Sequence, residues 1–252
     1  MSDVTSNAKH HFASAAGTRR RDRYFLFASA TLLLIVFVGF SPTLYLKVFF
    51  ATPDLPIYLH MHGGVITLWF LWLLSQTSLI AVNRVDLHRQ LGKIAAVFGF
   101  AVVPAGLMAI LGEVPRLREA GVDVEANLES ISAFFWGNLC DLLAFSGYLL
   151  AALYFRRQPD FHKRLMLLAS LVITLPALAR ISRWPVFSSI GEIPFALSAI
   201  AILLGTLFAH DLMTRRRLHV ATVVGGSYFL LNLLGGLMLG ETEFAQNFVR
   251  GL

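Results

Sequence analysis

Three histidines recur in a similar setting along the chain, within the stretches RVDLHRQLG, QPDFHKRLM and RRRLHVATV. These are His88, His162 and His219, and each follows a basic or Asp-containing turn and precedes an apolar run. Neutral imidazole is a common ligand of transition metals and of haem iron. The repeated setting therefore suggests a metal or haem site, although no tight spacing such as HExxH accompanies it.

Further candidate ligands lie beside these histidines. His210 is followed directly by Asp211, and Asp86 and Asp160 each stand two residues before a histidine. Carboxylate oxygens can bind a metal or orient an imidazole that does. Cys140 is the only cysteine, which excludes a disulfide within the chain and a cysteine-based iron–sulfur site. Histidine and carboxylate ligands are compatible with iron, copper or zinc, or with haem.

The same stretches are rich in basic residues, which supports a competing interpretation. Helix N-termini with basic side chains bind anions, so a lipid phosphate competes for this surface. The histidines would then cap helices and contact lipid headgroups. The basic residues concerned are Arg89, Lys93, Lys163, Arg164, Arg215, Arg216 and Arg217.

A second group of polar residues lies within apolar segments. His62, Trp69 and Gln76 follow at seven-residue steps, which places them on one face of a helix. His60 and His62 project about 200° apart on a helix, so both cannot easily bind one ion. We expect His62 to face other helices and His60 to face headgroups or water.

Asp141 falls near the middle of another apolar segment, with Asn138 one turn before it. An ionisable group at that depth is costly and is a candidate functional residue. Arg180 is its expected ion partner. The pattern fits a purely structural pair as well as a proton relay or a polar ligand pocket.

The composition indicates which elements position these residues. Hydrophobic residues form 56% of the 252 positions, and the mean hydropathy is +0.67, which is typical of a membrane protein. A helix needs about 20 mainly apolar residues to span the bilayer. Seven segments have this length and character, at roughly 24–47, 57–82, 93–112, 131–155, 165–184, 193–213 and 219–240. We therefore predict an all-α, polytopic bundle of about seven transmembrane helices in one domain over 21–252, after a disordered basic tail over 1–20.

Most of the 21 lysines and arginines fall in the N-terminal tail and in alternate loops. The positive-inside rule then predicts a cytoplasmic N-terminus and an external C-terminus. The net charge of +6 is explained by this topology and by attraction to anionic lipids, without nucleic-acid binding. We expect a short interfacial helix in the long 112–130 connection, and kinks at Pro104 and Pro176, because proline removes a backbone donor.

Five stretches occur in this order along the chain: HMHGGVITLWFLWLLSQ, RVDLHRQLG, QPDFHKRLMLLAS, LARISRW and HDLMTRRRLHVATVVGG. Together they resemble the motifs of a family of bacterial multi-spanning membrane proteins that has no established reaction. The resemblance implies seven helices in the bacterial inner membrane. His210 departs from this pattern, which often has Tyr beside the Asp. The polar motif positions match His62, His88, Asp141, His162, Arg180, Asp211 and His219. A looser similarity to haem and copper-oxidase assembly proteins, and to cytochrome b561-like bundles, rests on topology.

Two hypotheses on function follow. In the first, His88, His162 and His219 hold haem or a transition metal near the cytoplasmic face of a redox or cofactor-handling protein, which works with a redox or assembly partner in the membrane. A two-haem cytochrome would also need a facing histidine pair on the outer side, where only His60 and His62 occur on one helix. In the second, the protein is a non-enzymatic binder or transporter of a lipid-like or small polar ligand, with Asp141 in its interior.

Overall fold

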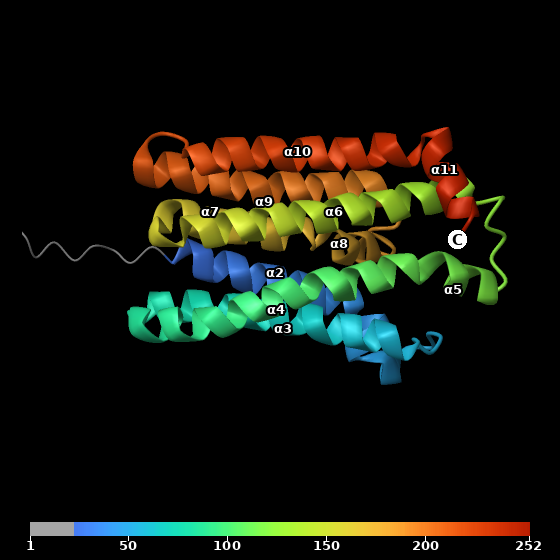
Figure 1. Ribbon diagram of the computed structural model, residues 1–252, viewed down its shortest axis with the longest axis horizontal. Helices are drawn as coiled ribbons and strands as arrows, with labels where there is room; N and C mark the ends of the chain where they lie inside the picture. Colours follow the sequence, from blue (N-terminus) through green and yellow to red (C-terminus); the bar gives the residue numbers. More distant parts are fainter. Residues whose placement is uncertain (1–22) are drawn as a thin grey trace, which may run out of the picture.

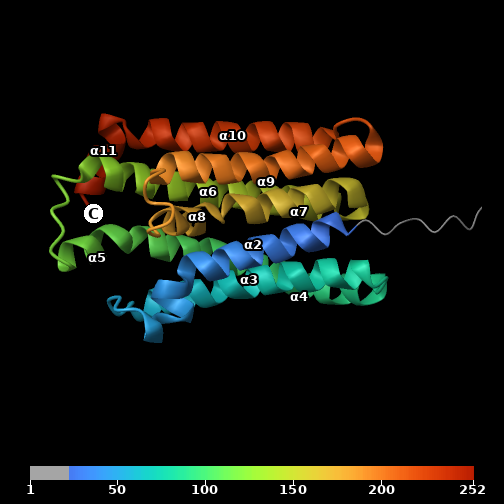
Figure 2. The ribbon, with the colours of Figure 1, turned by 180° about the vertical axis from the view of Figure 1, so that it is seen from behind.

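A computed structural model of the chain describes residues 23–252, and within them all regular structure is helical (Figures 1 and 2). Six helices are long and apolar enough to cross a membrane, and a bent pair makes a seventh if it forms one span. The predicted all-α polytopic bundle is thereby confirmed for this part of the chain. The tail predicted over 1–20 lies outside the described residues.

The helix bounds follow the hydropathy pattern closely, but two helices begin several residues earlier than predicted, at 85 rather than 93 and at 159 rather than 165. The membrane-length helices are α2 (Tyr24–Phe40, continued by a π-helical turn over Ser41–Tyr45), α3 (Ile57–Ala81), α4 (Val85–Leu111), α6 (Leu128–Tyr154), the bent pair α7 (Pro159–Val172) and α8 (Leu175–Ser182), α9 (Glu192–Arg215) and α10 (Val220–Gly240). Short 3₁₀ turns cover Lys47–Phe49 and Phe155–Arg157. Helix α4 begins eight residues before the predicted 93. Its first two turns are rich in polar residues, so the hydropathy pattern does not reveal them.

The segment predicted over 165–184 is broken rather than straight. Helix α7 ends at Val172 and α8 begins at Leu175, with a bend of 42° between them. Pro176, in the first turn of α8, has no N–H to donate to the carbonyl of Val172, so the helix cannot continue regularly. The predicted kink is confirmed here. Helix α4, by contrast, continues through Pro104 without a break.

The two ends of the bundle differ in character. The start of α2, the α3–α4 turn, the α6–α7 connection and the α9–α10 connection lie together at one end, which we call the basic end (Figure 1). The other end, which we call the loop end, holds α5 (Glu113–Glu119), α11 (Glu243–Arg250) and the C-terminus. Helix α5 confirms the short helix predicted within 112–130.

Large apolar side chains fill the middle of the bundle. Trp69, Phe145 and Phe229 are almost fully buried, and the Trp69 and Phe145 rings meet edge to face with centroids 5.1 Å apart. The indole Nε1 of Trp69 donates a hydrogen bond to Ser170 Oγ at 3.1 Å, so α3 is joined to α7 inside the core. Helix α6 packs against α10, α7 and α4 and forms the centre of the arrangement.

Two glycines permit the closest approaches between helices. A Cβ on Gly39 would lie 2.5 Å from the carbonyl oxygen of Ala177, so α2 crosses α8 backbone to backbone. A Cβ on Gly240 would lie 2.4 Å from the Cα of Ala133, where α10 meets α6. These contacts fix how the helices that carry polar residues are placed.

Candidate functional site

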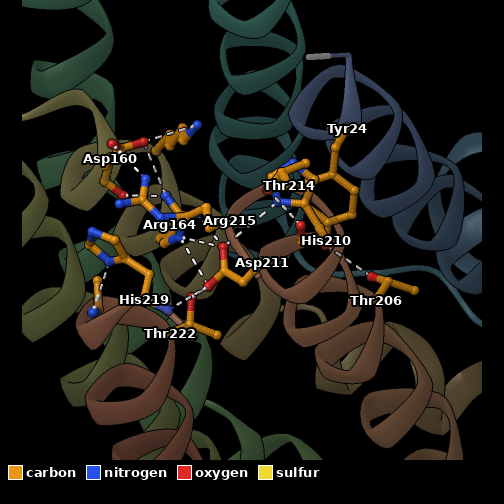
Figure 3. Close-up of polar contacts among 12 residues, drawn as sticks. Tyr24, Asp160, Arg164, Thr206, His210, Asp211, Thr214, Arg215, His219 and Thr222 are labelled. Atoms are coloured by element: carbon orange, nitrogen blue, oxygen red, sulfur yellow. Dashed lines mark hydrogen bonds and ion pairs between the residues drawn. The ribbon is translucent and has the colours of Figure 1, made fainter. Parts of the chain in front are cut away.

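A buried ion pair joins α7 to α9 at the basic end (Figure 3). Neither the Arg164 nor the Asp211 residue is exposed to solvent. The Nε of Arg164 donates to Asp211 Oδ1 at 3.0 Å, and Nη2 contacts the same oxygen. The other oxygen of Asp211 accepts from Thr222 Oγ1 at 2.5 Å and from the backbone N–H of His219 at 3.1 Å. The carboxylate is therefore fully satisfied, and it fastens α7, α9 and α10 together.

A second carboxylate extends this network toward the surface. Arg164 Nη1 donates to the backbone oxygen of Asp160 at 2.8 Å. Arg215 Nη1 donates to Asp160 Oδ2 at 2.8 Å (Figure 3). Lys163 Nζ lies 3.3 Å from Asp160 Oδ1. Because their oxygens already accept from these donors, Asp160 and Asp211 act in the structure as ion-pair acceptors rather than as open metal ligands.

The network corrects part of the predicted headgroup surface. Arg164 is not an interfacial cation, because its guanidinium is buried against Asp211. Asp86, a predicted oxygen ligand, pairs instead with Arg84 at the surface, at 3.2 Å. Four of the predicted headgroup residues remain exposed at the basic end, namely Arg89, Lys93, Arg216 and Arg217.

His219 acts as the N-cap of α10. Its Nδ1 accepts the backbone N–H of Ala221 at 3.1 Å, and its ring meets Phe161 edge to face at 4.6 Å. Burial, followed by the nearby positive charges of Arg164 and Arg215, lowers the pKa of His219 below its usual range. The neutral ring that results leaves Nδ1 free to accept, as the cap requires.

The four histidines of the basic end do not converge as predicted. His210 stacks on Tyr24 with ring centroids 4.3 Å apart (Figure 3). Phe25 meets the His210 ring edge to face. His219 is engaged in its cap. Across residues 23–252, no group of three or more His, Cys, Asp and Glu side chains is placed so that it could hold a metal ion. The separation arises because the helices turn His210 and His219 toward different neighbours.

The rings of the remaining two histidines lie close together. His88 lies in the first turn of α4 and His162 in the first turn of α7. Their ring centroids are 6.3 Å apart, and the ring planes are inclined by 74°. His162 Nδ1 is 2.9 Å from the carbonyl oxygen of Ala152; since a carbonyl only accepts, Nδ1 donates and Nε2 keeps a free lone pair.

Unpaired polar atoms accompany this histidine pair. The Nδ1 of His88 is buried and has no hydrogen-bond partner within the described residues, and the same holds for both side-chain polar atoms of Gln76. Gln76 approaches α4 at Gly92, where a Cβ would lie 3.6 Å from its Oε1. Buried polar atoms without partners are uncommon, and they mark places where a water or a ligand completes the bonding.

Asp141 is paired differently from the prediction. Its Oδ1 accepts from Asn232 Nδ2 at 2.9 Å, across the α6–α10 interface. Arg180 instead donates to the backbone oxygen of Pro176 at 3.0 Å and lies over the Phe40 ring. The predicted Asp141–Arg180 ion pair is therefore wrong, because α8 presents its arginine to α2 rather than to α6.

The other predicted intramembrane residues are distributed over separate helix contacts. His62 Nδ1 donates to the backbone oxygen of Ala105 on α4 at 3.0 Å, whereas Asn138 Nδ2 donates to Phe134 within its own helix at 2.6 Å. Trp69 bonds to α7, as described above. Within residues 23–252, no hydrogen bond or ion pair joins two of the six residues predicted for this site. His60 is exposed, as expected.

Three polar partners were not identified from the sequence. Ser170 receives the Trp69 N–H, Thr222 donates to Asp211, and Asn232 donates to Asp141. Asn232 interrupts the apolar run YFLLNLLGG in the middle of α10, which is a signal that could have identified it. Ser170 and Thr222 resemble the many hydroxyl residues that bond only to their own helix, so they carry no comparable signal.

The chain was compared with protein-family models, with curated proteins and with solved structures, and no match was found in any of the three.

Proposed function

We propose that this multi-pass protein has a redox or cofactor-handling role in the bacterial inner membrane, and that His88 and His162 hold a transition-metal ion or a haem iron between them. The observation that carries the proposal is the close approach of these two rings at the basic end. With His210 and His219 engaged elsewhere, the proposed ligand set contains two histidines rather than three or four.

The separation of the rings supports binding of one metal from two opposite sides. An imidazole nitrogen lies about 2.0–2.1 Å from a metal that it binds, which places the metal about 3.2 Å from the ring centre. Two rings on opposite sides of one ion would then have centroids about 6.4 Å apart by the same geometry. His88 and His162 stand at 6.3 Å. Imidazole is a ligand of both copper and haem iron, so a pair of histidines would suit either group.

The orientation of His162 supports the same role. Histidines that bind metals commonly donate their other ring nitrogen to a carbonyl or carboxylate, which fixes the ring and its tautomer. Ala152 supplies that carbonyl for His162. His88 has a buried Nδ1 without a partner, and metal binding through this nitrogen would satisfy it.

The test is metal and haem analysis of the full-length protein, purified in a non-ionic detergent from cells supplied with iron, copper, zinc and haem. We expect about one equivalent of metal or haem, and loss of most of it in His88→Ala and in His162→Ala, because one remaining ring binds far more weakly. Absorption spectra distinguish haem from a bare ion.

His219→Asn and His60→Ala are the matched controls. Asparagine can still cap α10, and His60 is exposed, so both variants should retain the metal. Metal-free unaltered protein would overturn the proposal. Equal loss of metal in the two controls would also overturn it, since the binding would then be unspecific.

A further inference from the structure

Arg116 and Arg183, near the loop end, each have a carboxylate partner. Arg116 Nη2 is 2.8 Å from Glu113 Oε1, and Arg183 Nε is 3.0 Å from Glu192 Oε2. Arg180, on α8, forms no ion pair with any residue from 23 to 252. Its charge therefore has no direct counter-ion among the described residues.

The protein holds the Arg180 side chain in place without neutralising it. Its Nη1 donates to the Pro176 carbonyl within α8, and its guanidinium carbon lies 4.4 Å from the centroid of the Phe40 ring on α2. This leaves Nε and Nη2 with no hydrogen bond to the described residues. A cation with unused donors in a membrane-length segment is costly, and such residues mark ligand sites.

We propose that Arg180 binds the oxyanion headgroup of an amphiphile. A guanidinium presents two parallel N–H donors that match the two oxygens of a carboxylate or phosphate. An apolar chain on the ligand suits a site on the apolar bent pair α7 and α8, beside Phe40. The site is independent of the His88–His162 pair, which lies at the basic end, so either proposal can fail without the other.

The test is the binding of cis-parinaric acid, a fluorescent fatty acid, to the full-length protein in an uncharged detergent. Saturable binding is expected for the unaltered protein. We expect Arg180→Gln to raise the Kd about tenfold or more, because the charge-assisted bonds are lost.

Arg183→Gln is the matched control, because it removes a positive charge only three residues from Arg180. Arg183 belongs to an exposed ion pair with Glu192. Its Kd should stay within about twofold of the unaltered value, as for other exposed charges. If Arg180→Gln does not fold, Arg180→Lys keeps the charge but loses the two-donor geometry, and the Kd should still rise severalfold.

Competitors identify the source of the headgroup. Displacement of the probe by oleate indicates a fatty-acid carboxylate, displacement by phosphatidylglycerol indicates a lipid phosphate, and displacement by inorganic phosphate indicates a free anion. Each of these results supports an oxyanion site. The proposal is overturned if the unaltered protein shows no saturable binding, if Arg180→Gln and Arg180→Lys bind as the unaltered protein does, or if Arg183→Gln weakens binding equally.

Discussion

At the scale of single residues, Asp211 is the most deeply buried of the described carboxylates. Four donor atoms from three other residues converge on it, and none of the carboxylate is accessible to solvent. A buried ion pair adds little net stability compared with an apolar pair of the same volume, but breaking one side of it leaves an uncompensated charge. The change in stability caused by altering Arg164 or Asp211 should therefore depend on whether the other residue is altered as well.

We expect Asp211→Asn to lower the free energy of unfolding by about 3–5 kcal/mol, because Arg164 would stay buried without its counter-ion. The double variant Arg164→Met, Asp211→Leu should lose less than the single variant. Asp86→Asn is the control; its pair with Arg84 is exposed, so its effect should be about 0–1 kcal/mol. Unfolding by sodium dodecyl sulfate in mixed micelles measures all three. Equal losses in Asp211→Asn and Asp86→Asn would contradict the expectation.

The pairing of Arg164 shows why residue-level contacts are hard to predict from sequence. Arg89 and Arg164 both follow a first-turn histidine at the start of an apolar helix, and their sequence settings are alike. One is exposed and the other is buried. The difference depends on how α7, α9 and α10 are rotated about their axes, which the sequence of any one helix does not determine.

At the scale of elements, the sequence was a much better guide. Apolar runs of bilayer length located every long helix, because hydrocarbon admits few other structures. Pro176 correctly indicated the break between α7 and α8, since a missing N–H has a local effect. The partner of Asp141 could not be predicted in the same way. Both Asn232 and Arg180 lie in apolar segments, and choosing between them required knowing that α6 packs against α10.

The crossing of α2 and α8 yields a test at this scale. We expect Gly39→Ala to lower the free energy of unfolding by about 1–3 kcal/mol, because the added methyl group would meet the Ala177 backbone, which cannot rotate away. Gly235→Ala is the control, as a Cβ there has no neighbour within 4 Å. It should change stability by no more than about 1 kcal/mol, in the stabilising direction that helix propensity predicts. Thermal unfolding in detergent compares them, and identical midpoints would show that the two helices can separate at little cost.

At the scale of the whole molecule, α2 starts at one end of the bundle and the C-terminus lies at the other (Figures 1 and 2). This arrangement requires an odd number of passes, so α7 and α8 together count as one span. The basic residues cluster in the connections of the basic end, so the positive-inside rule predicts that this end faces the cytoplasm.

Cysteine labelling tests this orientation in a Cys140→Ala background. We expect Val122→Cys, in the exposed loop after α5, to react with a membrane-impermeant maleimide added outside intact cells. Arg217→Cys, in the connection between α9 and α10, should react only after the membrane is permeabilised. The reverse pattern would place the His88–His162 pair on the external side.

The interruption at Ile173 and Thr174 has a mechanical consequence. A continuous helix moves as a rod, so a displacement at one end is transmitted along its axis to the other. Here the chain changes direction by 42° between His162 and Arg180, so α7 and α8 do not share one axis. A shift of α8 along its own axis is therefore directed away from the axis of α7. The coupling free energy that this pair carries between the two ends of the protein should be smaller than that of one straight helix.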